Sequence, residues 1–298
     1  MSLAAKVTDR STKDALQRVL CERAQMGVDE VREHGLDADL HALRKRIKEL
    51  RGLLRLLRSG LPQAKALDTK LRDAARGLGQ SRDLQVMLDQ FDALTGGLRA
   101  PAHFSRLRAL ILDARAAREE TDLVSAIATY SETLHQVTKA ASDLSLSDKA
   151  SHLMWRNLHK TYHRARQDQQ RAETAMRKGF EAEPFHEWRK WVKRHWYQAR
   201  FLEAIKPAKM TAHIAACDAL GESLGDHNDL DVLMVFLDNH TDLPPEDQSA
   251  REIFRGHCLA RRKALALEAI YQAKTVFRQS PDALAAKWQR WWRDWRDA

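Results

Sequence analysis

The fold class is decided by residues 41–58, which read HALRKRIKELRGLLRLLR. Apolar side chains recur there at steps of three and four residues, at Leu43, Ile47, Leu50, Leu54 and Leu57. This spacing is typical of one face of an α-helix. The stretch therefore predicts an amphipathic helix whose leucine-rich face packs into a core.

A second pattern runs along the same predicted helix. Basic side chains follow the helical spacing on a neighbouring face, at His41, Arg44, Lys48, Arg51, Arg55 and Arg58. Residues 41–58 hold seven Lys or Arg and a single acid, Glu49. Like charges one turn apart destabilise a helix slightly. The row is therefore either a solvated helix face or a surface whose missing negative charge comes from a bound polyanion.

Both patterns return later in the chain. Residues 186–193 read HEWRKWVK and align with HALRKRIK at residues 41–48. Residues 224–232, LGDHNDLDV, align with LGQSRDLQV at residues 78–86. The repeat predicts two related helical halves, residues 1–148 and 149–298. Each half would be an antiparallel helical bundle, with a pseudo-two-fold axis between the two.

Further basic residues extend this pattern. The repeated helix presents His186, Arg189, Lys190, Lys193 and Arg200. A third row at helical spacing contains His152, Arg156, His159, His163 and Arg166. Weaker matches between the halves pair Arg108 with Arg255 and Arg115 with Arg262. Each row alone could be a solvated face, but repetition at matching positions favours anion binding.

Composition limits the fold. The 298 residues include only 12 Gly and 7 Pro, and 31% are charged. So few turn-forming residues disfavour an all-β fold and disorder. We expect an all-α protein of about ten helices, in which the region Phe104–Lys139 forms one long helix or two. Asp83 and Asp229 are expected to be helix caps.

Charge and cysteine usage limit the partners and the compartment. The formal net charge of +9 predicts anionic partners. The three cysteines are odd in number and far apart in the chain, which predicts a reducing cytoplasm. No apolar stretch of about 18 residues is present, so we expect no membrane span.

The chemistry that the sequence favours is phosphate binding rather than catalysis. Arg offers a planar bidentate fork and Lys a compact charge, and both suit phosphate oxygens. We find no glycine-rich phosphate loop and no carboxylate cluster beside the basic rows that would hold Mg²⁺. His159 and His163 have metal-ligand spacing, but the surrounding Lys and Arg would repel a divalent cation. We therefore expect no catalytic residue, no metal and no cofactor.

These residues resemble the conserved histidine α-helical domain family, known as CHAD. Its mark is His-x-x-Arg-x-x-x-Arg/Lys on a helix, present twice, with a Leu-Gly-x-x-Arg-Asp-Leu-x-Val segment after each copy. The first copy here begins at His41 and Leu78, and the second at His186 and Leu224. The resemblance covers roughly residues 10–280.

The resemblance implies an all-α fold of two bundles with a basic channel or cavity between them. It also implies that the protein is not an enzyme but binds inorganic polyphosphate and associates with polyphosphate granules in the cytoplasm. Phosphate or sulfate would mimic the ligand in crystals. The expected polyphosphate-binding residues are His41, Arg44, Lys45, Lys48, Arg51, Arg55, Arg108, Arg115, Arg156, His163, Arg166, His186, Arg189, Lys190, Lys193, Arg200, Arg255 and Arg262.

The sequence departs from the family pattern at three positions. Asn228 stands where the pattern has Arg, Trp196 aligns with Arg51, and Glu49 replaces a usual base. The second half is therefore expected to bind more weakly or to be shaped by aromatic side chains.

Two other functions remain open from the sequence. Trp188, Trp191, Trp196 and Tyr197 interleave with basic residues, as stacking platforms for nucleic-acid bases do. The second of these alternative functions is that of a metal-dependent phosphohydrolase.

The C-terminal residues form a separate feature. Trp288, Trp291, Trp292 and Trp295 form an apolar face with Leu284. This face predicts a helix docked on the bundle, with a dimer contact or a membrane surface as alternatives.

Overall fold

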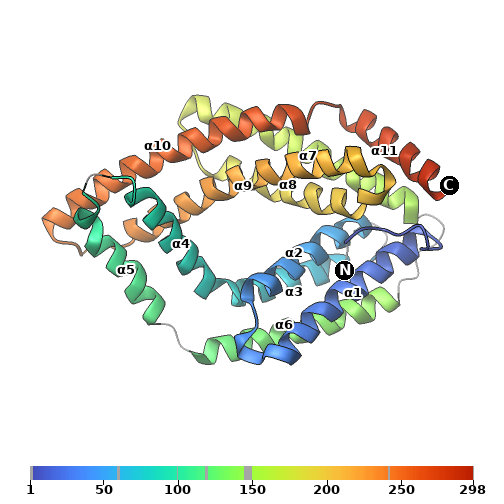
Figure 1. The fold of residues 1–298 in the computed structure, drawn as a ribbon, viewed down its shortest axis with the longest axis horizontal. Helices are drawn as coiled ribbons and strands as arrows, with labels where there is room; N and C mark the ends of the chain where they lie inside the picture. The colour runs from blue at the N-terminus through green and yellow to red at the C-terminus, as the bar shows by residue number, and fades with distance from the viewer. Residues whose placement is uncertain are drawn as a thin grey trace.

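A computed structural model describes residues 3–58, 61–98, 100–117, 120–143, 150–240 and 242–297. Within these ranges the chain is helical and contains no strand (Figure 1), which confirms the all-α prediction. The α-helices are α1 (Thr12–His34), α2 (Leu40–Leu57), α3 (Ala64–Gly77), α4 (Gly79–Thr95), α5 (Ser105–Ala116), α6 (Glu120–Ser142), α7 (Ala150–Lys178), α8 (Glu183–Phe201), α9 (Pro207–Asp238), α10 (Pro245–Val276) and α11 (Pro281–Arg296). Three short 3-10 helices lie at Gly35–Asp37, Pro101–Phe104 and Glu203–Ile205.

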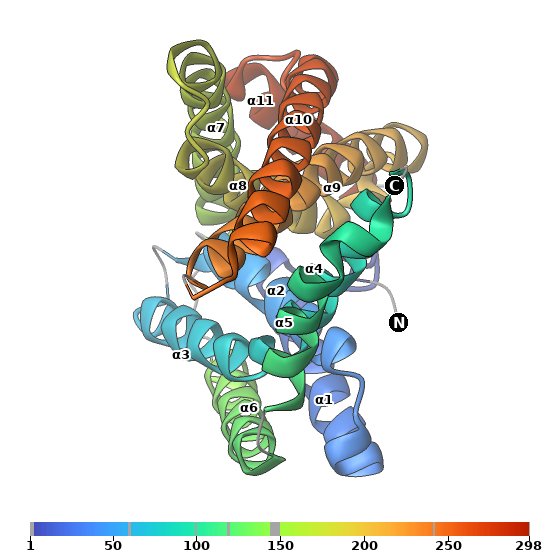
Figure 2. The same ribbon diagram turned by 90° about the vertical axis from the view of Figure 1, so that its left-hand side faces the viewer.

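The helices pack as two groups that meet along α2 and α8. Helices α1, α2, α3 and α6 contact one another, and helices α7 to α11 form the second group. Figure 2 shows the second group above the first, with α4 and α5 reaching up along one side. Helix α2 contacts both α7 and α8, so one continuous hydrophobic core joins the groups. The basic rows on α2 and α8 are therefore brought to the same region of the molecule.

A smaller core lies at one end of the molecule. Helices α4 and α5 pack there against the C-terminal part of α9 and the N-terminal part of α10 (Figure 1). The stacked rings of Phe91 and Phe254, with centroids 4.6 Å apart, lie in this core. Helices α4 and α5 of the first half of the chain therefore pack against helices α9 and α10 of the second half.

Local sequence explains where the helices begin. The leucine-rich face of α2 is buried as predicted, and Leu43, Ile47 and Leu50 have no exposed surface. The Asp39 carboxylate accepts a hydrogen bond of 2.8 Å from the His41 N–H and caps α2. Proline occupies the first position of α9, α10 and α11. A backbone N–H at this position has no acceptor within the helix, so the missing N–H of proline costs no hydrogen bond.

Several sequence-based boundaries are settled by the structure. The region Phe104–Lys139 forms two helices, α5 and α6. The predicted caps are wrong, because Asp229 lies in the interior of α9 and Asp83 lies within α4. Helix α9 continues past Gly225 since packing against α8 sustains it there. The predicted boundary between residues 148 and 149 lies outside the described residues.

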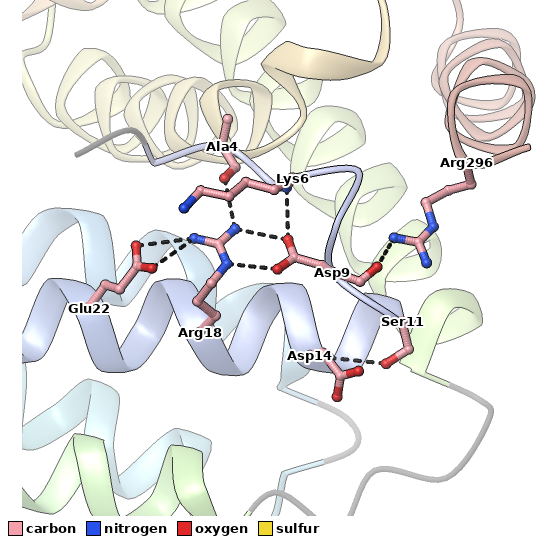
Figure 3. Close-up of polar contacts among 8 residues, drawn as sticks. All are labelled: Ala4, Lys6, Asp9, Ser11, Asp14, Arg18, Glu22 and Arg296. Atoms are coloured by element: carbon pink, nitrogen blue, oxygen red, sulfur yellow. Dashed lines mark hydrogen bonds and ion pairs between the residues drawn. The ribbon is translucent and has the colours of Figure 1, made fainter. Parts of the chain in front are cut away.

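The tryptophan-rich C-terminal helix docks on the bundle, as expected. Trp288 and Trp292 of α11 are buried, and the Trp292 ring lies 6.2 Å from the ring of Trp155 on α7. At its end, Arg296 donates hydrogen bonds to the backbone carbonyls of Asp9 and Arg10. Figure 3 shows Arg296 at the backbone carbonyl of Asp9, whose carboxylate points away from it and pairs with Arg18. The last helix therefore also fixes the N-terminal segment.

We expect Arg296→Ala to lower the free energy of unfolding by about 1 kcal/mol, because two carbonyls lose a charged donor that is only half-buried. In a chain of this length, this loss of unfolding free energy corresponds to a fall of about 2 °C in Tm. Thermal unfolding followed by circular dichroism measures it. Arg293→Ala is the control, since Arg293 lies on the same helix and is exposed. Equal Tm values for the two variants would contradict the role of Arg296.

None of the described helices combines the length and apolar character needed to cross a lipid bilayer.

Candidate functional site

A cavity of about 700 Å³ lies between the two helices that carry the repeated His-x-x-Arg pattern. We call it the basic cavity. Its wall comes from α2, α3, α8 and α9. The cationic side chains in the wall are Lys45, Lys48, Arg51, Arg55, Arg72, Arg189, Lys190, Lys193 and Arg194, together with His41. Both halves of the chain thus contribute cations to one cavity.

Helical periodicity explains the first half's contribution. The positions of His41, Lys45, Lys48, Arg51 and Arg55 repeat at steps of three and four residues along α2, so they share one face. The leucine-rich face of the same helix lies in the core. Burial of the leucine face therefore holds the basic face toward α8.

Four carboxylates also line the cavity. They are Asp68, Glu187, Asp218 and Glu222. Their number is well below that of the nine Lys and Arg in the same wall, so the cavity keeps a positive excess. Asp68 and Asp218 come from α3 and α9, at positions that the repeat does not align.

Three of these carboxylates hold cavity cations in place. Asp68 accepts from Arg51 Nε at 2.7 Å and from Arg55 Nη2 at 2.8 Å. The Lys193 Nζ donates to Asp218 at 3.0 Å, and the Lys190 Nζ donates to Glu187 at 2.5 Å. Such pairs restrict the long side chains and orient them before a ligand arrives.

Arg194 is a cavity residue that the sequence analysis missed. Its guanidinium lies over the ring of Trp191, 4.2 Å from the centroid. Burial lowers the pKa of Arg194 to about 9, and repulsion from Arg55 and Arg51 adds to this effect. An anion placed among these three arginines would offset the repulsion. In the repeat, Arg194 aligns with Glu49. The alignment of the two halves therefore did not indicate a basic binding residue at this position.

Glycine on α9 allows one cavity cation to approach the helix closely. A Cβ at Gly221 would lie 2.7 Å from Lys193 Cε, whereas a Cβ at Gly225 would lie 3.6 Å from Arg189 Nε, an ordinary contact distance. The α8 side chains therefore lie along the α9 surface. On α2, a Cβ at Gly52 would lie 2.6 Å from the Cβ of Tyr197, so this glycine permits the close crossing of α2 and α8.

Glu49 anchors the helices behind the cavity. Its carboxylate has no exposed surface and lies 3.0 Å from Arg46, 3.4 Å from Arg200 and 3.6 Å from Arg23. The pair with Arg200 joins α2 to α8, and the pair with Arg23 joins α2 to α1. The acid that interrupts the basic row is thus a structural counter-ion.

The structure places ten of the expected binding residues outside the cavity wall. They are Arg44, Arg108, Arg115, Arg156, His163, Arg166, His186, Arg200, Arg255 and Arg262. Three of them pair with carboxylates at the far end of the molecule: Arg108 with Asp92 at 2.8 Å, Arg262 with Asp231 at 3.1 Å, and Arg255 with Asp238. Arg262 is also buried.

The others have different surroundings. Arg115 is exposed on α5, and Arg156 and His163 are exposed on α7. Arg166 donates to the Gln279 carbonyl at 3.3 Å, and Arg44 is half-buried on α2. The third basic row therefore faces away from the cavity.

The two histidines of the repeat are placed differently. His41 lines the cavity, whereas His186 contacts the side chain of Asn228. Asn228 is one of the three residues that depart from the family pattern, and it also donates to Asp229 at 3.2 Å. The residue that replaces Arg in the second copy therefore contacts the histidine of that same copy.

A comparison with protein families identifies the chain. The model of the CHAD domain matches residues 15–238. The chain belongs to the CHAD family. A solved CHAD domain from the plant Ricinus communis is similar to this CHAD protein, with a TM-score of 0.63 and 22% identity over 91% of this chain and 94% of that one. PptA from Streptomyces chartreusis is similar with a TM-score of 0.60 and 16% identity, over 90% of this chain and 99% of that one. No curated protein matches the sequence significantly.

Proposed function

We propose that this CHAD protein binds inorganic polyphosphate in the basic cavity and associates with polyphosphate granules through it. One observation carries the proposal: the cationic faces of α2 and α8 line the same cavity. Membership of the CHAD family supports it, because the family is associated with polyphosphate.

The arrangement of the cations suits a chain of phosphates better than a single one. Side chains one helical turn apart are separated by about 5.4 Å along the axis, so successive turns of α2 can reach different phosphates. Arg189, Lys190 and Lys193 face them from α8. A linear polyanion between the two helices would contact both rows at once.

Nucleic-acid binding receives less support from the aromatic residues. Trp188 has no exposed surface. Trp196 is covered by Lys193 and Arg200, whose charged groups lie 4.7 Å and 4.8 Å from its ring centroid. A base would have to displace these cations before it could stack on Trp196. We therefore favour a ligand that presents phosphate alone.

We further propose that the cavity binds its ligand without hydrolysing it. The carboxylates of Asp68, Glu187 and Asp218 already pair with Lys or Arg. A divalent cation would have to compete with these partners and with the positive excess around them. Incubation of the protein with polyphosphate and Mg²⁺ or Mn²⁺ tests this point, and phosphate release would overturn it.

Polyphosphate affinity should fall steeply with salt, by about 1000-fold between 50 mM and 200 mM when several phosphates are neutralised. Calorimetric titration with long-chain polyphosphate at the two salt concentrations measures the change. RNA at equal phosphate concentration is the competitor. Absence of binding at 50 mM would refute the proposed function, and efficient displacement by RNA would favour a nucleic-acid ligand instead.

A further inference from the structure

Three metal-ligating side chains converge beneath α11, apart from the basic cavity. His195 comes from α8, and His213 and Cys217 come from successive turns of α9. The Nε2 atoms of the two histidines are 2.9 Å apart, and Cys217 Sγ lies 3.4 Å from His213 Nε2. All three ligand atoms lie within 4.8 Å of one another. We propose that these residues, here called the thiol–imidazole cluster, bind a thiophilic d10 cation, Cu⁺ or Zn²⁺.

The distances between the ligand atoms suit metal coordination. With metal–nitrogen bonds of about 2.0 Å and metal–sulfur bonds of about 2.3 Å, tetrahedral angles separate two nitrogens by about 3.3 Å and a nitrogen from the sulfur by about 3.5 Å. The separations of His213 Nε2 from His195 Nε2 and from Cys217 Sγ are slightly shorter than these values, so small side-chain rotations would admit the ion. Thiolate and imidazole are the ligands that select Cu⁺ and Zn²⁺ among biological cations.

His195 and His213 are uncharged, which allows them to act as metal ligands. Burial holds the pKa of His195 well below its usual value, and it lowers the pKa of His213 to about 4, with Lys287 adding repulsion. Both rings are therefore neutral near pH 7, and each can offer a nitrogen lone pair.

Binding requires one proton to leave. Burial raises the pKa of the Cys217 thiol, so the protein without metal holds the S–H form. On binding, the S–H bond breaks, its proton goes to solvent, and the sulfur electron pair forms the bond to the cation. No oxidant or reductant takes part in this exchange.

Charge distinguishes the two cations. Cu⁺ with one thiolate and two neutral imidazoles has no net charge, whereas Zn²⁺ leaves one positive charge in a buried site near Lys287. An unpaired charge in an apolar interior is costly. Cu⁺ is therefore expected to bind more tightly than Zn²⁺.

The surroundings of the cluster provide a spectroscopic reporter. The Trp288 ring of α11 stacks on His195 at 5.5 Å and meets His213 edge-on at 5.0 Å. His213 is only partly buried and gives the cluster an opening toward solvent. A bound ion would reorient both imidazoles and change the fluorescence of Trp288.

Anaerobic titration of the full chain with Cu⁺, and separately with Zn²⁺, tests the proposal. We expect one equivalent to bind, to raise Tm and to change tryptophan fluorescence. Cys217→Ser and His213→Gln should each weaken binding by about 100-fold or more, since each removes a ligand atom. Trp288→Phe should retain the ion but lose most of the fluorescence change.

Cys258→Ser is the matched control, because Cys258 is also wholly buried but lies in the smaller core. It should bind the ion as the unchanged chain does. Failure of both cations to bind stoichiometrically would overturn the proposal, as would binding that survives in Cys217→Ser. Tighter binding of Zn²⁺ than of Cu⁺ would overturn the charge argument. None of these outcomes depends on polyphosphate.

Discussion

Replacing Lys45 and Lys48 together by Glu should weaken polyphosphate binding at least 100-fold. Both residues are exposed on α2 and line the basic cavity. A charge-assisted hydrogen bond contributes about 1.5–3 kcal/mol, so loss of two such contacts alone exceeds a factor of 100. The introduced carboxylates would in addition repel the phosphates. Titration at 150 mM salt measures the effect.

The control separates a site from general attraction by a basic protein. Lys160→Glu with Lys263→Glu changes the net charge by the same amount, at exposed positions on α7 and α10 outside the cavity wall. At 150 mM salt the screening length is about 8 Å, so these distant changes should alter affinity only a few-fold. Equal losses in the two double variants would show that the cavity is not the binding site.

The features that the sequence predicted well depend on one helix at a time. The leucine face of α2 follows from periodicity alone, and so does the basic face beside it. The docking of Trp288 and Trp292 likewise follows from the apolar face of their helix, because such a face is stable when it is buried against other apolar residues. The all-α fold follows from the scarcity of Gly and Pro and from the repeated pattern.

The features that the sequence missed depend on how helices cross. Asp68 and Asp218 reach the cavity because α3 and α9 pack against α2 and α8, which no spacing within a helix reveals. Arg262 is different, because a signal was present. It follows Cys258 by four residues and precedes Leu265 by three, so it belongs to the buried face of α10.

The cysteine and histidines beneath α11 also left a partial signal. His213 and Cys217 are one helical turn apart, on the face of α9 that continues to Leu220 and Leu224. That spacing predicts a shared orientation toward the core. The third member, His195, could not be paired with them from sequence, since its position depends on the packing of α8 against α9.

Glu49→Gln should lower the free energy of unfolding by about 3–5 kcal/mol, the usual cost of removing one partner from a buried ion pair. The Glu49 side chain has no exposed surface, and that of Arg23 is 3% exposed. The amide keeps a hydrogen-bond acceptor but removes the negative charge, so Arg23, Arg46 and Arg200 are left to repel one another. Urea unfolding followed by circular dichroism measures the change.

Glu22→Gln is the matched control, because Glu22 pairs with Arg18 at a position with 23% side-chain exposure and Arg18 keeps its contact with Asp9. It should cost less than about 1 kcal/mol. The double variant Glu49→Gln with Arg23→Gln should be more stable than the sum of its single changes predicts, because the second change removes the uncompensated charge. Additive losses would mean that Arg23 does not depend on Glu49. Coupled losses would instead show that Glu49, the single acid in the basic row of α2, neutralises Arg23 of α1 in the core.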